Sequence, residues 1–214
     1  MKPVLPIPPF LYPIVDVGLL GERRVGEVVA ALVRGGARIL QLRAKAVSDR
    51  RLVELARAAL AATREGGAVL LVNDRPDVAR IVGADGVHLG QDDLPPADAR
   101  TVLGADAIVG FSTHSVEQLQ RAASQPVDYV AVGPVFPTST KANPDPVVGL
   151  DLVREARGLV AQPLVAIGGI RPGNARAVVE AGADGLAVAS ALLQAADLPA
   201  QCAAFQAALR GDLE

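Results

Sequence analysis

Three polar side chains alternate along a hydrophobic segment and could together hold an anion. In ARILQLRAK, residues 37–45, Gln41, Arg43 and Lys45 stand at every second position. Alternate residues of a strand point to the same face of the sheet. An amide and two cations that face a protein interior are costly unless something anionic meets them. We therefore expect an anionic group opposite this face.

Two aspartates follow two later hydrophobic segments and could supply oxygen ligands. Asp74 comes after AVLLVN, and Asp93 comes shortly after DGVHLG. A few carboxylates without a cluster of His and Cys suit Mg²⁺, which keeps water and phosphate among its ligands. Taken singly, each Asp fits better as a helix cap. Together with Arg43, Lys45 and Lys141, the two aspartates indicate a diphosphate site bridged by magnesium.

A second anion site is indicated near the end of the chain. AIGGI contains Gly168 and Gly169, and VASALL places small residues around Ser190. Backbone N–H groups at a helix start can hold a phosphate, and glycines let the ligand approach closely. The alternative is that these glycines only allow tight packing.

The two histidines carry weaker expectations. We interpret His88 as a neutral, hydrogen-bonded side chain near the rim of the site. His114 fits a solvated or capping role, although an acid–base role is also open.

Short apolar segments alternate with helical patterns along the whole chain. Eight such segments separate stretches with apolar residues at three- and four-residue spacing, and Ser48 and Ser115 are expected N-caps of two of the helices. This alternation predicts a (β/α)₈ TIM barrel as a single domain over residues 1–214, with a C-terminal helix at about residues 198–210. An open doubly wound sheet is the alternative, but no GxGxxG pattern follows the first segment. The eight segments are FLYPIVD, RILQLR, AVLLVN, DGVHLG, AIVGFS, YVAVGPV, PLVAIGG and DGLAVAS.

Composition limits the classes of partner. Apolar residues make up 50% of the chain and aromatic residues 3%, which favours short buried strands covered by helices. A net charge of −2 without a basic run argues against nucleic acid. No apolar run is long enough for a membrane span. The single cysteine, Cys202, has no partner for an internal disulfide, so we expect a cytoplasmic protein.

The motifs together resemble the thiamine-phosphate synthase family, also called thiamine-phosphate pyrophosphorylase. The matching segments are LYPIVD, QLRAK, VNDR, DGVHLGQDD, GFSTHS, DYVAVGPVFPTSTK, AIGGI and AGADG. The family joins 4-amino-5-hydroxymethyl-2-methylpyrimidine diphosphate to 4-methyl-5-(2-phosphoethyl)thiazole, or to its carboxylated form, and releases pyrophosphate with Mg²⁺. The resemblance implies the same reaction for this chain.

The resemblance also implies roles for individual residues. Gln41, Arg43, Lys45 and Asn73 would contact the pyrimidine diphosphate, Asp74 and Asp93 would hold Mg²⁺, and Ser112 and Lys141 would bind the diphosphate. The thiazole phosphate would be received by Thr138, Ser139, Thr140, Gly168, Gly169, Ala189 and Ser190. Arg43, Lys45, Ser112 and Lys141 would carry the catalysis.

The chain departs from the family pattern at one position, and two other functions would also fit a barrel of this kind. The family usually has an acidic residue where this chain has Ala44, and we expect that position to point away from the ligand. A thiazole tautomerase on the same barrel would use a histidine such as His114, and a non-catalytic barrel would only bind a phosphorylated metabolite. The expected partners are small-molecule substrates, and a homo-oligomer is allowed for.

Overall fold

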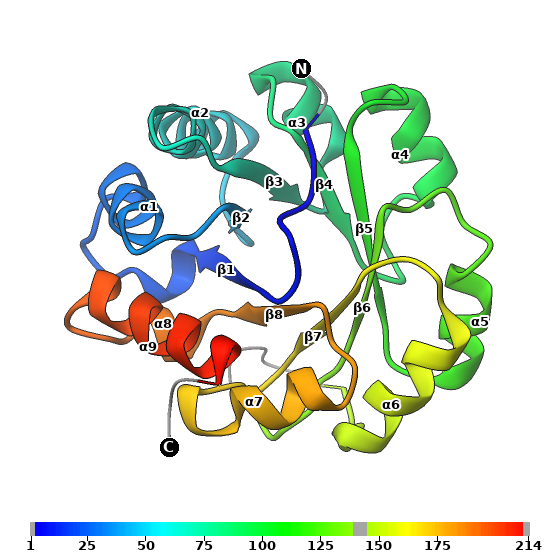
Figure 1. Cartoon of the computed structure of the whole chain (residues 1–214). Helices are drawn as coiled ribbons and strands as arrows, with labels where there is room; N and C mark the ends of the chain where they lie inside the picture. Colours follow the sequence, from blue (N-terminus) through cyan, green and yellow to red (C-terminus); the bar gives the residue numbers. More distant parts are fainter. Residues whose placement is uncertain (1–2, 139–144, 212–214) are drawn as a thin grey trace.

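Eight parallel strands close into a barrel with helices on its outside (Figure 1). The computed structural model describes residues 3–138 and 145–211. Every strand pairs in parallel with its neighbour in the chain, and β8 pairs with β1. The prediction of a TIM barrel is therefore confirmed, and the open sheet is excluded. The strands are β1 (Phe10–Asp16), β2 (Ile39–Arg43), β3 (Val69–Asn73), β4 (Gly86–Leu89), β5 (Ile108–Thr113), β6 (Tyr129–Val132), β7 (Leu164–Ile167) and β8 (Gly185–Val188).

The helices connect consecutive strands and cover the barrel. Ser48 and Ser115 cap two of them as predicted, because their hydroxyl groups accept from the N–H groups of Arg51 and Gln118. The helical elements are η1 (Val17–Leu19), α1 (Val25–Arg34), α2 (Asp49–Glu65), α3 (Pro76–Val82), α4 (Pro96–Leu103), α5 (Val116–Ala122), α6 (Gly149–Leu159), α7 (Pro172–Glu180), α8 (Ser190–Leu193) and α9 (Leu198–Arg210).

The alternation of side chains along each strand divides the core in two. On β2, Leu40 and Leu42 face the helices and belong to the larger apolar cluster. Ile39 belongs to a smaller cluster inside the barrel, together with Tyr12 and Tyr129. This two-residue period places Gln41 and Arg43 on the inward face, as the sequence predicted. No helix within the described residues is both long and apolar enough to cross a membrane.

Candidate active site

The cations of the second βα unit lie at the carboxyl ends of the strands and meet carboxylates of the chain itself. Arg43, the last residue of β2, forms an ion pair with Asp16, the last residue of β1. The Asp16 side chain is only 8% exposed and the Arg43 side chain 22%. A guanidinium in this setting is stabilised by a carboxylate partner. Asp16 therefore offsets part of the free-energy cost of burying the Arg43 cation on the inward face of β2.

Lys45, Asp74 and Asp93 connect the second, third and fourth βα units at the same end of the barrel. The Lys45 ammonium forms an ion pair with the Asp74 carboxylate. The Asp93 carboxyl group interacts with that of Asp74 and accepts from the N–H of Gly90 at 2.7 Å. Burial, then the Asp74 carboxyl group, raises the pKa of Asp93 from 3.8 to about 6. Two carboxyl groups therefore meet here, as the sequence predicted.

Neither of these aspartates caps a helix, so the capping alternative is wrong. The N-cap of α3 is Arg75 and that of α4 is Pro95. Asp74 adopts a left-handed backbone conformation, with φ at 63°, and its N–H donates to the carbonyl of His88 at 2.8 Å. The turn after β3 thus directs the Asp74 side chain to Lys45 and Asp93.

The oxygen donors fit a hard cation that keeps ligands from water or substrate. Two carboxyl groups in contact are relieved of mutual repulsion when a cation lies between them. Within the described residues, no group of three or more His, Cys, Asp or Glu side chains forms a metal site. The protein would thus contribute two carboxylates, which is a donor set suited to Mg²⁺.

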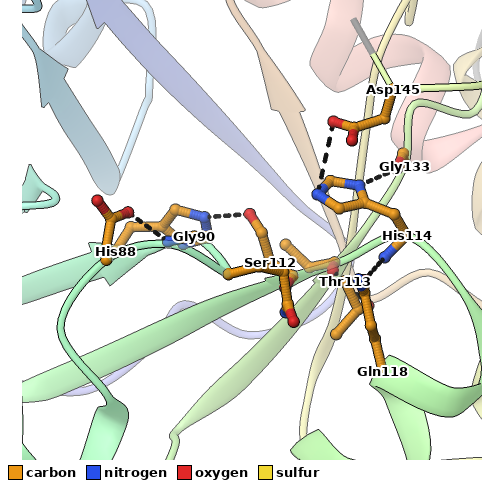
Figure 2. A network of polar contacts seen from close by, with 11 residues as sticks. His88, Gly90, Ser112, Thr113, His114, Gln118, Gly133 and Asp145 are labelled. Atoms are coloured by element: carbon orange, nitrogen blue, oxygen red, sulfur yellow. Dashed lines mark hydrogen bonds and ion pairs between the residues drawn. The ribbon is translucent and has the colours of Figure 1, made fainter.

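Gln41 lies deeper than the sequence suggested. Its side chain is buried, and its Nε2 donates to the hydroxyl of Tyr12 at 3.0 Å inside the barrel. Asn73 ends β3 and pairs in register with His88 of β4. The Nε2 atom of His88 lies 2.8 Å from Oγ of Ser112 (Figure 2). His88 is hydrogen-bonded, as predicted, but its side chain is buried inside the barrel.

The glycines after β7 accommodate the loop after β6. A Cβ at Gly168 would lie 2.4 Å from Cβ of Pro134, and one at Gly169 would lie 2.6 Å from the carbonyl oxygen of Pro137. Their φ angles are 104° and 63°. Close packing therefore explains both glycines, and a role in binding phosphate stays a prediction. Ala189 precedes α8 as its N-cap residue, and Ser190 is the first residue of α8.

The loop after β6 is described only in part. Thr138 is the last described residue before the gap, while Ser139, Thr140 and Lys141 lie outside the described residues. Asp145 follows the gap, and its Oδ2 lies 3.6 Å from Nε2 of His114. Figure 2 shows His114 between Asp145 and the carbonyl of Gly133, which lies 2.6 Å from Nδ1. His114 therefore faces this loop from the end of β5.

Ala44 lies where the sequence analysis expected. It packs against the apolar cluster between barrel and helices and does not face the barrel mouth.

Asp16, Tyr12 and Tyr129 were not among the residues predicted from the sequence. The signal for Asp16 was present, because it ends the first predicted strand as Arg43 ends the second. Tyr12 follows from the same alternation, since it lies four positions before Asp16 on the same face. No local pattern distinguished Tyr129, the first residue of its strand.

A closed parallel barrel with charged side chains at the carboxyl ends of its strands is the arrangement of (β/α)₈ barrel enzymes. The family model described as thiamine monophosphate synthase matches residues 11–192. The chain belongs to this family, and it is therefore an enzyme of the transferase class. The resemblance seen in the sequence is confirmed.

Individual relatives agree with this membership. A protein of Koribacter versatilis named thiamine-phosphate synthase is 48% identical over 189 residues, which cover 86% of this chain and 89% of the relative. One of Azorhizobium caulinodans with the same name is 46% identical and covers 88% of this chain and 89% of the relative. The solved thiamine phosphate pyrophosphorylase from Pyrococcus furiosus has a TM-score of 0.85 at 36% identity, covering 96% of this chain and 97% of that one.

Proposed function

We propose that this transferase joins the 4-amino-2-methylpyrimidin-5-ylmethyl group of its diphosphate to 4-methyl-5-(2-phosphoethyl)thiazole or its carboxylated form. The products are thiamine phosphate and pyrophosphate, and carbon dioxide is released as well when the thiazole is carboxylated. The partners in this proposal are small molecules, and the reaction takes place in the cytoplasm, with a homo-oligomer allowed for. The relatives' names support the reaction type, and the residues at the barrel mouth support the diphosphate.

The observation that carries the proposal is the line of contacts across the first four βα units. Asp16 pairs with Arg43, and Lys45 pairs with Asp74, which in turn contacts Asp93. The two cations, Arg43 and Lys45, can hold a diphosphate, and the carboxylates of Asp74 and Asp93 at the same rim can hold a divalent cation beside it. A proton-transfer enzyme would not require this arrangement.

Arg43 and Lys45 would stabilise the departing pyrophosphate. The aminopyrimidine ring donates electrons to its exocyclic carbon, so the carbon–oxygen bond can break with a cationic carbon as the result. The negative charge then grows on the diphosphate oxygens, where fixed cations act most strongly. Ser112 would donate a hydrogen bond from its hydroxyl group to the diphosphate, and Lys141 would add a further cation.

Asp74 and Asp93 would hold Mg²⁺ in this proposal. When bound, the ion would neutralise charge on the diphosphate and so favour its departure. The two carboxylates would also keep Lys45 oriented toward the mouth, since Asp74 contacts both Lys45 and Asp93.

The second substrate would be positioned by its phosphate. Thr138, Gly168, Gly169, Ala189 and Ser190 would receive it, and Ser139 and Thr140 from outside the described residues would join them. The thiazole nitrogen carries no proton, so its attack on the cationic carbon requires no general base. Positioning the two substrates would supply most of the rate enhancement.

Calorimetry and a product assay separate this function from its rivals. We expect the pyrimidine diphosphate to bind in the presence of Mg²⁺, and pyrophosphate to be released when the thiazole phosphate is added. Binding without release would indicate a non-catalytic barrel. Double-bond migration in the carboxylated thiazole alone would indicate a tautomerase.

The variant Asp74→Ala tests the carboxylate at the centre of the site. Removing it deprives Lys45 of its partner and Mg²⁺ of a ligand, so turnover should fall by about 10²-fold while the fold persists. Asp98→Ala is the matched control, because Asp98 is an exposed residue in the first turn of α4. Equal turnover in the two variants would contradict the assignment.

A further inference from the structure

A chain of hydrogen bonds runs through the barrel interior to the active-site serine. Gln41 Nε2 donates to the hydroxyl of Tyr12 at 3.0 Å, and that hydroxyl lies 2.9 Å from the hydroxyl of Tyr129. The Tyr129 hydroxyl lies 2.7 Å from Nδ1 of His88, and Nε2 of His88 lies 2.8 Å from Oγ of Ser112. The five residues come from five strands, β1, β2, β4, β5 and β6, and the chain of hydrogen bonds ends at Ser112 near the mouth of the barrel.

The amide at the inner end fixes the direction of the chain. An amide nitrogen can only donate, so the Tyr12 oxygen accepts a hydrogen bond from Gln41. The Tyr12 hydroxyl in turn donates its hydrogen bond to the Tyr129 oxygen. The Tyr129 hydroxyl then donates a hydrogen bond to Nδ1 of His88. A neutral imidazole that accepts at Nδ1 carries its proton on Nε2, which donates to Ser112.

The reverse direction is disfavoured. If Ser112 donated to His88, then His88 would donate to Tyr129 and Tyr129 to Tyr12. Among the described residues, no acceptor would then remain for the hydroxyl hydrogen of Tyr12. Tyr12 is 1% exposed, and leaving a buried hydroxyl hydrogen unpaired is costly. Burial also raises the pKa of both tyrosines, so both keep their protons as donors.

Space for the chain is provided by a glycine. Gly110 of β5 pairs in register with His88 on one side and with Tyr129 on the other. A Cβ at Gly110 would lie 2.0 Å from Cζ of Tyr129 and 2.3 Å from its hydroxyl oxygen. Any larger residue would therefore displace Tyr129 from the contact with His88.

We propose that Tyr129 and His88 are positioning residues that hold Ser112 as a hydrogen-bond donor to the substrate. His88 is held as the Nε2–H tautomer, and Ser112 Oγ accepts from it. The hydroxyl hydrogen of Ser112 then has to point elsewhere, into the barrel mouth, where a diphosphate oxygen can accept it. This last step depends on the proposed function, whereas the tautomer does not.

His114, the second histidine, serves as an internal reference for the tautomer of His88. Nδ1 of His114 lies 2.6 Å from the carbonyl oxygen of Gly133, which can only accept. His114 therefore carries a proton on Nδ1. The chain contains two histidines, and the structure predicts that Nδ1 is protonated in one and unprotonated in the other.

Two-bond ¹H–¹⁵N correlation spectra of the imidazoles test the tautomer without any substrate. We expect one histidine with a protonated Nε2 and an unprotonated Nδ1, and we expect its signals to remain in His114→Asn. A protonated Nδ1 on His88 at neutral pH, in either the other tautomer or the cation, would overturn the proposal.

Two variants at equally buried tyrosines test which hydroxyl group fixes the tautomer of His88. In Tyr129→Phe the donor to Nδ1 is lost, so the spectrum should show that His88 is no longer held in one tautomer. In Tyr12→Phe the hydroxyl of Tyr129 still donates to His88, so the tautomer should be kept. Identical spectra in the two variants would contradict the directional chain.

Binding of pyrophosphate with Mg²⁺ tests the link to Ser112. Ser112→Ala and Tyr129→Phe should each weaken binding by about tenfold, the cost of one hydrogen bond to an anion. The double variant should be no weaker than Ser112→Ala, because Tyr129 acts through Ser112. Additive losses would make Tyr129 merely structural and would overturn the link. Failure of the unsubstituted enzyme to bind pyrophosphate would count against the proposed function, and the tautomer result would stand by itself.

Discussion

At the scale of single residues, the barrel mouth depends on carboxylates that meet cations. Arg43 and Lys45 each pair with an aspartate at the carboxyl end of a neighbouring strand. A cation held in this way is already oriented when an anion arrives, which lowers the cost of binding. The sequence identified the cations by their alternation. It also offered Asp16 as the last residue of the first predicted strand, but the contact between Asp16 and Arg43 depends on the register of β1 and β2.

Asp16→Ala should destabilise the enzyme. The change leaves the largely buried Arg43 without its partner and removes the acceptor for the N–H of Gly18. We expect a loss of about 2 kcal/mol in the free energy of unfolding, measured by chemical denaturation. Asp151→Ala is the control, because Asp151 is 97% exposed and its pair with Arg154 should contribute little. A similar loss in both variants would refute the role of Asp16.

Asp93 should make stability depend on pH and on Mg²⁺. Its pKa of about 6 lies above the ordinary 3.8, so its contribution to folding is complete below pH 3.8 and is lost as the pH rises through about 6. Asp93→Asn keeps an acceptor for Gly90 and removes the charge. The metal-free variant should therefore melt at a higher temperature than the parent above pH 6.

Added Mg²⁺ should reverse that order. Above pH 6 it should raise the melting temperature of the parent enzyme and have much less effect on Asp93→Asn, because the variant lacks one carboxylate. Equal stabilisation of both proteins by Mg²⁺ in differential scanning calorimetry would show that Asp93 is not a ligand.

At the scale of elements, the same set of aspartate contacts recurs at the amino-terminal ends of three alternate strands, β4, β6 and β8. An aspartate just before the strand accepts from an N–H of the preceding strand and pairs with an arginine of the helix that leads into that preceding strand. Each set of contacts therefore joins two strands and a helix at the amino-terminal end of the barrel. The sets are Asp85 with Leu70 and Arg64, Asp128 with Val109 and Arg100, and Asp184 with Leu164 and Arg157.

Asp85→Ala should destabilise the barrel by about 2 kcal/mol, because the buried N–H of Leu70 loses its acceptor. Asp85→Asn should cost about half as much, since an amide oxygen can still accept from that N–H. Denaturant titrations of the two variants measure the difference. Equal losses would mean that the charge, and not the acceptor, is what matters.

The elements themselves were largely predictable from the sequence. Hydrophobic period and cap residues place β1 at Phe10–Asp16 and α2 at Asp49–Glu65, because both signals are local. The close approach of Gly168 and Gly169 to Pro134 and Pro137 was not predictable, since it depends on how two loops pack.

At the scale of the whole molecule, α9 packs where the barrel closes. It contacts α1, α7 and β1, and Figure 1 shows it beside α8 on the outside of β1 and β8. Cys202 of α9 is fully buried, and a Cβ at Gly35 would lie 2.7 Å from its Cβ. The closed barrel and this helix therefore depend on each other.

The single thiol should report opening of α9. Burial raises the pKa of Cys202 to about 11, and the side chain is inaccessible in the folded enzyme. A thiol reagent at neutral pH should therefore react only as fast as the barrel unfolds. Labelling that is much faster than global unfolding, as followed by circular dichroism, would show that α9 detaches on its own.

The central claim is that a diphosphate and Mg²⁺ bind among Arg43, Lys45, Asp74 and Asp93. An electron-density map of crystals soaked with pyrophosphate and Mg²⁺ tests it most directly. We predict an anion in contact with both cations, and a metal ion bound to both carboxylates. An anion bound elsewhere on the molecule, with Arg43 still paired to Asp16 and Lys45 still paired to Asp74, would contradict the account.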